Sequence, residues 1–199
     1  MIRGALKNRL EGEGWDMEVE RGGRMEWEVV IGGNKKEEKE KWEKGIKKWM
    51  EKAVVGISDA SRINGRVGIG RMIWVYGKRY KKWAKGRGYG LTIQDGEMAG
   101  VAEILDEMRR YKGEARVLRI GVDNMGVLRC LRKGIGMCGK WEQKVREWGK
   151  ELLKKGWDIK WRWVPGHVGI EKNEMVQSLV INVRESLVSN LAKNARLRP

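Results

Sequence analysis

An apolar run that ends in an asparagine-glycine pair constrains the fold of this chain more than any other feature of its sequence. Residues 53–63 are rich in Val, Ile and Ala, and Asn64-Gly65 follows directly. Because Asn-Gly favours the two-residue turn of a β-hairpin, residues 67–76 are expected to return as an antiparallel strand. The sequence therefore predicts a hairpin that is apolar enough to be buried.

Helices and strands alternate beyond this hairpin. Residues 78–87 are expected to form a basic connection to a third strand at 89–93. Asp95 is a candidate N-cap for a helix over 97–111, where apolar residues recur at helical spacing. The elements expected after it are a strand at 117–122, a short helix, a longer helix with Trp141, Val145, Trp148 and Leu152 on one stripe, a strand at 157–163 and a helix at 173–194. This order predicts a mixed α/β sheet of five strands, three antiparallel and then two parallel, with helices packed on it.

The first quarter of the chain has a different character. Residues 16–31 alternate apolar and acidic positions around Gly22-Gly23, a pattern typical of a hairpin. Residues 35–52 show the pattern of a highly charged helix with one apolar stripe. We interpret this hairpin and helix as an extension appended to the α/β sheet.

The net charge of +16 favours a polyanionic partner. Residues 1–52 carry about +1 and the remaining residues about +15, so the basic surface belongs to the sheet and its helices. Nucleic acid, acidic lipid and acidic protein all satisfy such a charge. No stretch is apolar for long enough to span a membrane. Cys130 and Cys138 lack a metal-binding spacing, which favours reduced thiols in an intracellular protein, cytoplasmic or nuclear.

Three acidic residues stand where a metal site could form. Asp59 closes an apolar run inside an expected central strand, where Asp is rare, although a turn-forming Asp is the alternative. Glu97 begins an expected helix, a place that the helix dipole alone would favour for an acid. Asp123 ends an expected buried strand, where α/β ligand sites gather, and an N-cap is its alternative. No one of the three decides the function by itself.

A longer motif gives these acids a context. The run Trp163-Val164-Pro165-Gly166-His167-Val168-Gly169-Ile170, followed by Asn173-Glu174, resembles the type I ribonuclease H family, in particular the domains attached to retroelement reverse transcriptases. Three further blocks match in order and spacing: Ser58-Asp59-Ala60-Ser61 with the Asn64-Gly65 turn, Glu97-Met98-Ala99-Gly100, and Asp123-Asn124. The resemblance covers residues 53–185. It implies an extension at 1–52, a ribonuclease-H-like domain at 53–185 and a C-terminal helix end with a basic tail at 186–199.

The resemblance implies an activity and a cofactor. Members of the family hold two divalent cations, Mg²⁺ with Mn²⁺ as a substitute, on four carboxylates and hydrolyse the RNA strand of an RNA–DNA hybrid. Asp59, Glu97 and Asp123 match the first three carboxylates. His167 matches a loop histidine that assists proton movement or product departure, whereas without the resemblance a single loop histidine is more simply structural. A reverse transcriptase polyprotein is the implied context.

The fourth carboxylate is missing. Gln177 stands where the family has aspartate, Val176 where it has alanine, and Lys172 where it has glycine. A neutral amide keeps an oxygen donor but removes a charge, which predicts weaker metal binding and reduced activity. Glu174 lies one helical turn earlier and is a possible substitute. A catalytically inactive nucleic-acid-binding relic or domesticated module is the alternative function, and a transposase or integrase is a third.

Candidate substrate contacts are less specific. Lys81, Lys82 and Trp83 lie in the basic run, which predicts phosphate contacts with aromatic stacking, the alternative being a solvated hairpin whose Trp83 packs on its neighbours. By resemblance, Thr92 and Asn124 are candidates for contacting the hybrid. Hybrid selectivity would require groups that sense 2′-hydroxyls in the shallow minor groove.

Overall fold

A six-stranded mixed sheet forms the centre of the molecule in the computed structural model, which describes residues 28–31, 34–87, 91–133 and 139–196. The order across the sheet is β1-β6-β5-β2-β3-β4. The strands β2, β3 and β4 pair antiparallel, whereas β2, β5, β6 and β1 pair parallel. The strands are β1 (Glu28–Val30), β2 (Val54–Ile63), β3 (Arg66–Val75), β4 (Lys78–Arg87), β5 (Val117–Val122) and β6 (Asp158–Trp163).

The strand count corrects the prediction of five. The additional strand is β1, which pairs parallel with β6 and so forms one edge of the sheet. The sequence predicted a self-contained hairpin over residues 16–31, most of which lies outside the described residues. Its last part pairs with a distant strand, because Val29 lies opposite Trp161. Pairing over this separation depends on the tertiary structure, which local alternation does not reveal.

The β2–β3 hairpin is confirmed. Asn64 and Gly65 both have positive φ angles, 48° and 76°, which is the conformation that a type I′ turn requires. The register runs from Ile63 opposite Arg66 to Val54 opposite Val75. This long hairpin places the middle of β2 between β3 and β5, in the interior of the sheet.

The predicted position of the third strand is wrong. Residues 78–87 are not a connection but strand β4, joined to β3 by a tight turn in which Tyr76 and Gly77 have φ angles of 48° and 74°. The predicted strand at 89–93 lies partly outside the described residues, and Ile93 begins a helix. β4 is an edge strand with mostly exposed lysine side chains. Charged side chains are common on edge strands because they discourage pairing with other chains. The lysines of β4 therefore gave its sequence the character of a loop.

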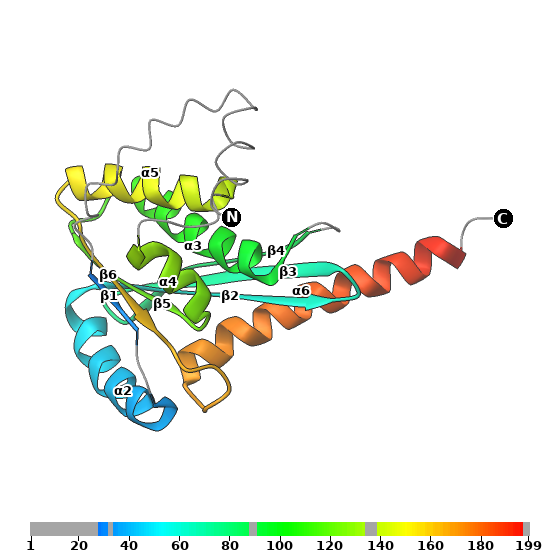
Figure 1. Cartoon of the computed structure of the whole chain (residues 1–199), viewed down its shortest axis with the longest axis horizontal. Helices are drawn as coiled ribbons and strands as arrows, with labels where there is room; N and C mark the ends of the chain where they lie inside the picture. The colour runs from blue at the N-terminus through cyan, green and yellow to red at the C-terminus, as the bar shows by residue number, and fades with distance from the viewer. Residues whose placement is uncertain (1–27, 32–33, 88–90, 134–138, 197–199) are drawn as a thin grey trace, which may run out of the picture.

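Helices cover both faces of the sheet (Figure 1). One face packs against α3, α4 and α5 around a core that includes Leu105, Leu128 and Val145. The other face packs against α2 and α6 around a core that includes Trp42 and Val180. The helices are α2 (Lys35–Lys52), α3 (Ile93–Arg109), α4 (Met125–Lys133), α5 (Lys140–Lys154) and α6 (Glu171–Arg196). No described helix is both long and apolar enough to cross a membrane.

Two local features of the helices bear on the site. The N-cap of α3 is Thr92 and not Asp95, because the Thr92 side chain accepts from the Asp95 backbone and Asp95 closes a capping box in return. Helix α2 is anchored by Trp42, whose side chain is 0% exposed. A Cβ on Gly121 of β5 would lie 2.6 Å from the Trp42 ring, so the absence of a side chain there lets α2 lie close against the sheet.

Candidate metal centre

Asp59, Glu97 and Asp123 reach one point of the molecule from separate elements. Asp59 lies in β2, and Asp123 directly follows the neighbouring parallel strand β5, where Ser58 and Val122 are paired. Glu97 lies in the first turns of α3. Helix α3 can approach this closely because Gly96 has no side chain: a Cβ there would lie 2.7 Å from Val67. The elements that the sequence predicted therefore bring these three acids together.

The three carboxylates form a compact cluster. Each offers one oxygen, and these oxygens all lie within 4.8 Å of one another. Oε1 of Glu97 accepts a hydrogen bond from the Ala60 backbone N–H at 3.1 Å, which fixes the carboxylate against β2. Oε2 of Glu97 is buried and has no hydrogen-bond partner. A buried carboxylate oxygen without a partner is costly, so this atom suits a bound cation.

Burial and mutual repulsion make the cluster hard to ionise. Burial, and then the charge of Asp123, raise the pKa of Asp59 to about 7. Burial, followed by the charges of Asp123 and Asp59, raises the pKa of Glu97 well above its usual range. Burial also raises the pKa of Asp123, although the neighbouring Glu97 carboxyl and the charge of His167 act against it. A cation among the three would relieve the repulsion that raises these pKa values.

The donor set therefore fits a hard divalent cation. Carboxylate oxygens are the ligands that Mg²⁺ and Mn²⁺ prefer, and these cations keep several water ligands, so a few carboxylates from different elements suffice. Asp59, Glu97 and Asp123 could hold a metal ion. These carboxyl groups release their protons when a cation binds, so the affinity for the cation should rise with pH.

Thermal unfolding in the presence of Mn²⁺ tests this fit. The folded-state pKa of Asp59 is raised to about 7 from 3.8, so the metal-free fold loses stability as pH rises through that window. A bound cation removes this penalty and competes with protons. Millimolar Mn²⁺ should therefore raise Tm by several degrees at pH 8, corresponding to about 2 kcal/mol, and by much less at pH 5.5. An equal rise at both pH values would contradict binding at these carboxylates.

The cluster lies in a groove of about 650 Å³. His167 lines the groove from the loop after β6, with a φ angle of 59°. Gly166 holds this loop close to the cluster, because a Cβ there would lie 3.0 Å from Oδ2 of Asp123. Gln177 of α6 also lines the groove, and its Nε2 lies 3.3 Å from Nδ1 of His167. Gln177 and His167 are therefore neighbours of the three acids.

The predicted substrate contacts do not all gather there. Asn124 lines the groove, and its Oδ1 accepts from the backbone N–H of Gly126 at 2.9 Å, at the start of α4. Thr92 caps α3 and lines a different cavity, together with Trp141. The three predicted contacts from the basic run are not among the residues that line the groove, since they lie on edge strand β4: Lys81, Lys82 and Trp83.

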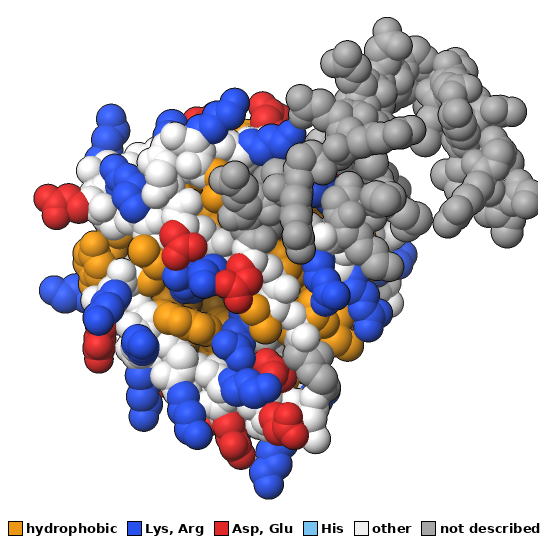
Figure 2. Space-filling model, turned by 60° about the vertical axis from the view of Figure 1, so that its left-hand side comes forward, with side chains coloured by type: hydrophobic (Ala, Val, Ile, Leu, Met, Phe, Trp, Pro, Cys, Tyr) orange, Lys and Arg blue, Asp and Glu red, His pale blue; other side chains and the backbone are white. Residues whose placement is uncertain are grey.

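Basic residues that the sequence analysis did not single out also line the groove. They are Lys35, Arg62 and Arg184. Nη1 of Arg184 donates to Oγ of Ser61 at 2.6 Å, which holds the guanidinium beside β2. Arg184 lies two helical turns after Gln177, so helical spacing alone could have indicated that both face the same side. On the face shown in Figure 2, Lys and Arg side chains are spread widely with acidic ones among them, so charge alone does not locate a binding site.

Sequence comparisons give no match, whereas structural comparisons do. No protein-family model matches the sequence, and no curated protein matches it. RNase H1 from the halophilic archaeon Halobacterium salinarum is 16% identical, with 67% of this chain and 98% of that chain covered and a TM-score of 0.52. LC11-RNase H1 in complex with an RNA/DNA hybrid is 15% identical, with 67% and 99% covered and a TM-score of 0.55. The N-terminal RNase H domain of a Mycobacterium tuberculosis protein is 18% identical, with 70% and 99% covered and a TM-score of 0.54. At these identities the comparisons show the fold, and that fold is ribonuclease-H-like.

Proposed function

We propose that this chain is a metal-dependent endonuclease that hydrolyses the RNA strand of RNA–DNA hybrids, with activity reduced by the loss of one carboxylate at Gln177. The observation that carries the proposal is the convergence of Asp59, Glu97 and Asp123 in one groove of a ribonuclease-H-like fold. A structural neighbour with the same fold was solved with an RNA/DNA hybrid, which supports this substrate class.

The groove offers the groups that phosphodiester hydrolysis needs. A divalent cation there would activate a water molecule and stabilise charge on the phosphate, as metal ions do in nucleases. Asp59, Glu97 and Asp123 would hold the cation, which we expect to be Mg²⁺ or Mn²⁺. Arg62 and Arg184 line the same groove and can contact phosphates without regard to base sequence. His167 can accept or donate a proton beside the cluster.

Gln177 is the feature that limits the reaction. Its side-chain amide lies against His167, with Nε2 at 3.3 Å and 3.4 Å from the two ring nitrogens. Because an amide is neutral, Gln177 supplies no negative charge to the groove. A second cation would therefore lack one carboxylate ligand. The same observation favours a second candidate function, a nucleic-acid-binding module that has lost catalysis. We further propose that the chain derives from a retroelement reverse transcriptase polyprotein, in which residues 1–52 precede the domain at 53–185 and supply β1 and α2 to its sheet and core.

A panel of labelled duplexes tests the proposed function. The full chain should bind an RNA–DNA hybrid and cut it slowly in Mg²⁺ or Mn²⁺, while duplex DNA and duplex RNA of the same sequence stay intact. Chelation of the metal should stop cleavage without releasing the hybrid. Tight hybrid binding without cleavage in either metal would instead establish the inactive binding module, and cleavage of duplex DNA would overturn the hybrid assignment.

A further inference from the structure

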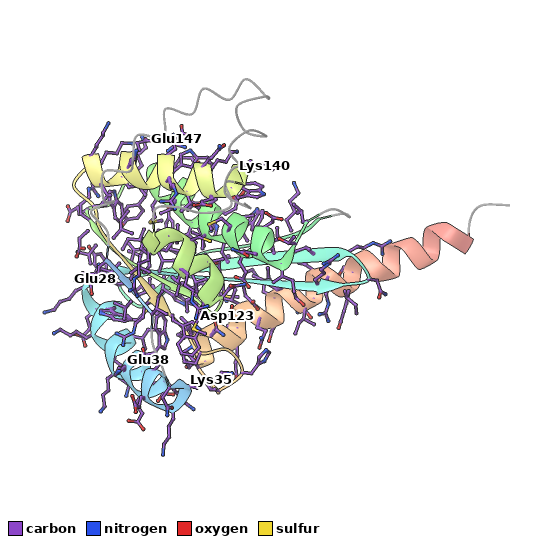
Figure 3. All side chains as sticks on the ribbon, viewed as in Figure 1. Glu28, Lys35, Glu38, Asp123, Lys140 and Glu147 are labelled. Carbon is purple, nitrogen blue, oxygen red and sulfur yellow. The ribbon has the colours of Figure 1, made fainter. Side chains whose placement is uncertain are left out.

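Helix α6 places an arginine in the groove beside the metal cluster. Arg184 lines the groove that holds Asp59, two helical turns after Gln177. Figure 3 shows Asp123 on the side of the sheet where α6 begins, and Figure 1 shows α6 continuing from there along the β2–β3 hairpin. The helix can lie close to β3 because Gly68 has no side chain: a Cβ there would lie 3.1 Å from Cβ of Arg184. Packing of the helix on the sheet therefore places this arginine.

The Arg184 guanidinium is anchored, and it keeps donors for a ligand. Its Nη1 donates to Oγ of Ser61 at 2.6 Å, and its buried Nε has no hydrogen-bond partner among the described residues. The Glu185 carboxylate lies 3.8 Å from Nη2, which is too far for a hydrogen bond. The Arg184 side chain is 19% exposed, whereas Lys35 and Arg62, the other basic residues that line the groove, are exposed. A buried donor without an acceptor is costly, so this guanidinium suits a bound anion.

Ser61 supplies a second donor beside the guanidinium. A hydroxyl oxygen that accepts from a guanidinium still has its own proton to donate. Ser61 follows Asp59 by two residues in β2, so both side chains lie on the same face of the strand, about 7 Å apart along it. Neighbouring phosphates of one nucleic-acid strand are separated by a similar distance.

We propose that Ser61 and Arg184 form a phosphate subsite, which holds the RNA-strand phosphate next to the one that is cut at the metal cluster. The two side chains offer a neutral and a charged donor to one phosphate, and charge-assisted hydrogen bonds of this kind are the stronger ones. Contact with a second phosphate would fix the position of the RNA strand relative to the three carboxylates. This inference rests on the proposed function and adds a site for a second phosphate of the same substrate.

Hybrid binding in chelator tests the subsite without relying on catalysis. The affinity of the full chain for a labelled hybrid is measured over a range of salt concentrations. Arg184→Met should weaken binding about tenfold and lower the slope of log affinity against log salt by about 1, because one phosphate contact is lost. Arg184→Lys keeps the charge and should retain the slope. Lys172→Met removes a lysine from the same helix that does not line the groove, and should bind like wild type.

Single neutral linkages locate the contacted phosphate. In a series of hybrids, one RNA-strand phosphate is replaced by a methylphosphonate on a 2′-O-methyl nucleotide, and the cuts in Mn²⁺ are mapped against hybrids with the same nucleotide and an ordinary phosphate. In wild type the neutral linkage should slow the cut at the neighbouring phosphate about tenfold, always on the same side. Arg184→Met should cut there slowly with either linkage, because the contact is already lost. Ser61→Ala should show a smaller effect of the neutral linkage than wild type.

Two results would overturn the subsite. One is an Arg184→Met variant with the salt slope of wild type, and the other is a neutral linkage that slows wild type and Arg184→Met by the same factor. If wild type cuts no hybrid, the proposed function fails, and the salt slopes still decide whether Arg184 contacts a phosphate.

Discussion

Asp59→Asn should lower the rate of hybrid hydrolysis at least about a hundredfold and yet stabilise the metal-free protein. Asp59 contributes one of the clustered oxygens, and an amide binds a divalent cation far more weakly than a carboxylate does. In the absence of metal the same carboxylate is a burden, because it is buried beside Asp123 with a pKa raised to about 7. Activity and stability should therefore move in opposite directions.

The size of the stabilisation depends on pH. A carboxyl whose folded-state pKa is raised costs stability above its unfolded pKa of 3.8, and the full cost is reached once the pH exceeds about 7. Asp59→Asn should thus gain on the order of 2 kcal/mol at pH 8 and close to nothing at pH 4. Urea unfolding at both pH values in chelator measures this. Asp158→Asn, which removes a half-exposed carboxylate from the start of β6, is the matched control and should retain activity. A destabilised Asp59→Asn protein would contradict the electrostatic account of the cluster.

Gln177→Asp should raise the rate of hybrid hydrolysis by about tenfold or more, with the largest gain at low metal concentration. The change keeps an oxygen at this position of α6, shortens the side chain and adds a negative charge to a groove that holds the three acids and His167. Added charge should strengthen cation binding and help the groove to accept a second ion. Initial rates measured across a range of Mg²⁺ concentrations report both effects.

A neighbouring position supplies the control for this gain. Ser178→Asp adds the same charge one residue further along α6, where the side chain is exposed and does not line the groove. It should leave the metal dependence unchanged. If Gln177→Asp behaves like Ser178→Asp, then Gln177 does not occupy a ligand position, and the proposal that its amide reduces activity is wrong.

Local signals in the sequence were enough to predict the centre of the fold, whereas the grouping of the three acids was predicted from the resemblance to the type I ribonuclease H family. The Asn64-Gly65 turn fixes the register of β2 and β3, because an αL pair is strained for most other residues. Strand β5 is short and buried, so Asp123 marked its end clearly. Because β2 and β5 are neighbouring parallel strands, Asp59 and Asp123 must lie close together, each one residue beyond the paired Ser58 and Val122.

Features that depend on tertiary contacts were missed. Strand β4 lacks an apolar face because it lies at the edge of the sheet, so its lysines resembled those of a loop. The apolar stripe in residues 35–52, which includes Trp42, predicted an amphipathic helix. Nothing in the local sequence indicated that this helix packs against Gly121 of β5. The place of Lys35 in the groove follows from that packing alone. Residues whose role is set by a distant glycine cannot be recognised from helical periodicity.

One cleavage experiment tests the central claim most directly. An RNA–DNA hybrid that carries a different dye on each strand is incubated with the full chain in Mn²⁺, and both strands are then sized. If the carboxylates of Asp59, Glu97 and Asp123 hold the catalytic metal ion, the RNA strand is shortened while the DNA strand stays whole, and Glu97→Gln leaves both strands intact. Shortening of the DNA strand, or RNA cleavage that persists in Glu97→Gln, would contradict it.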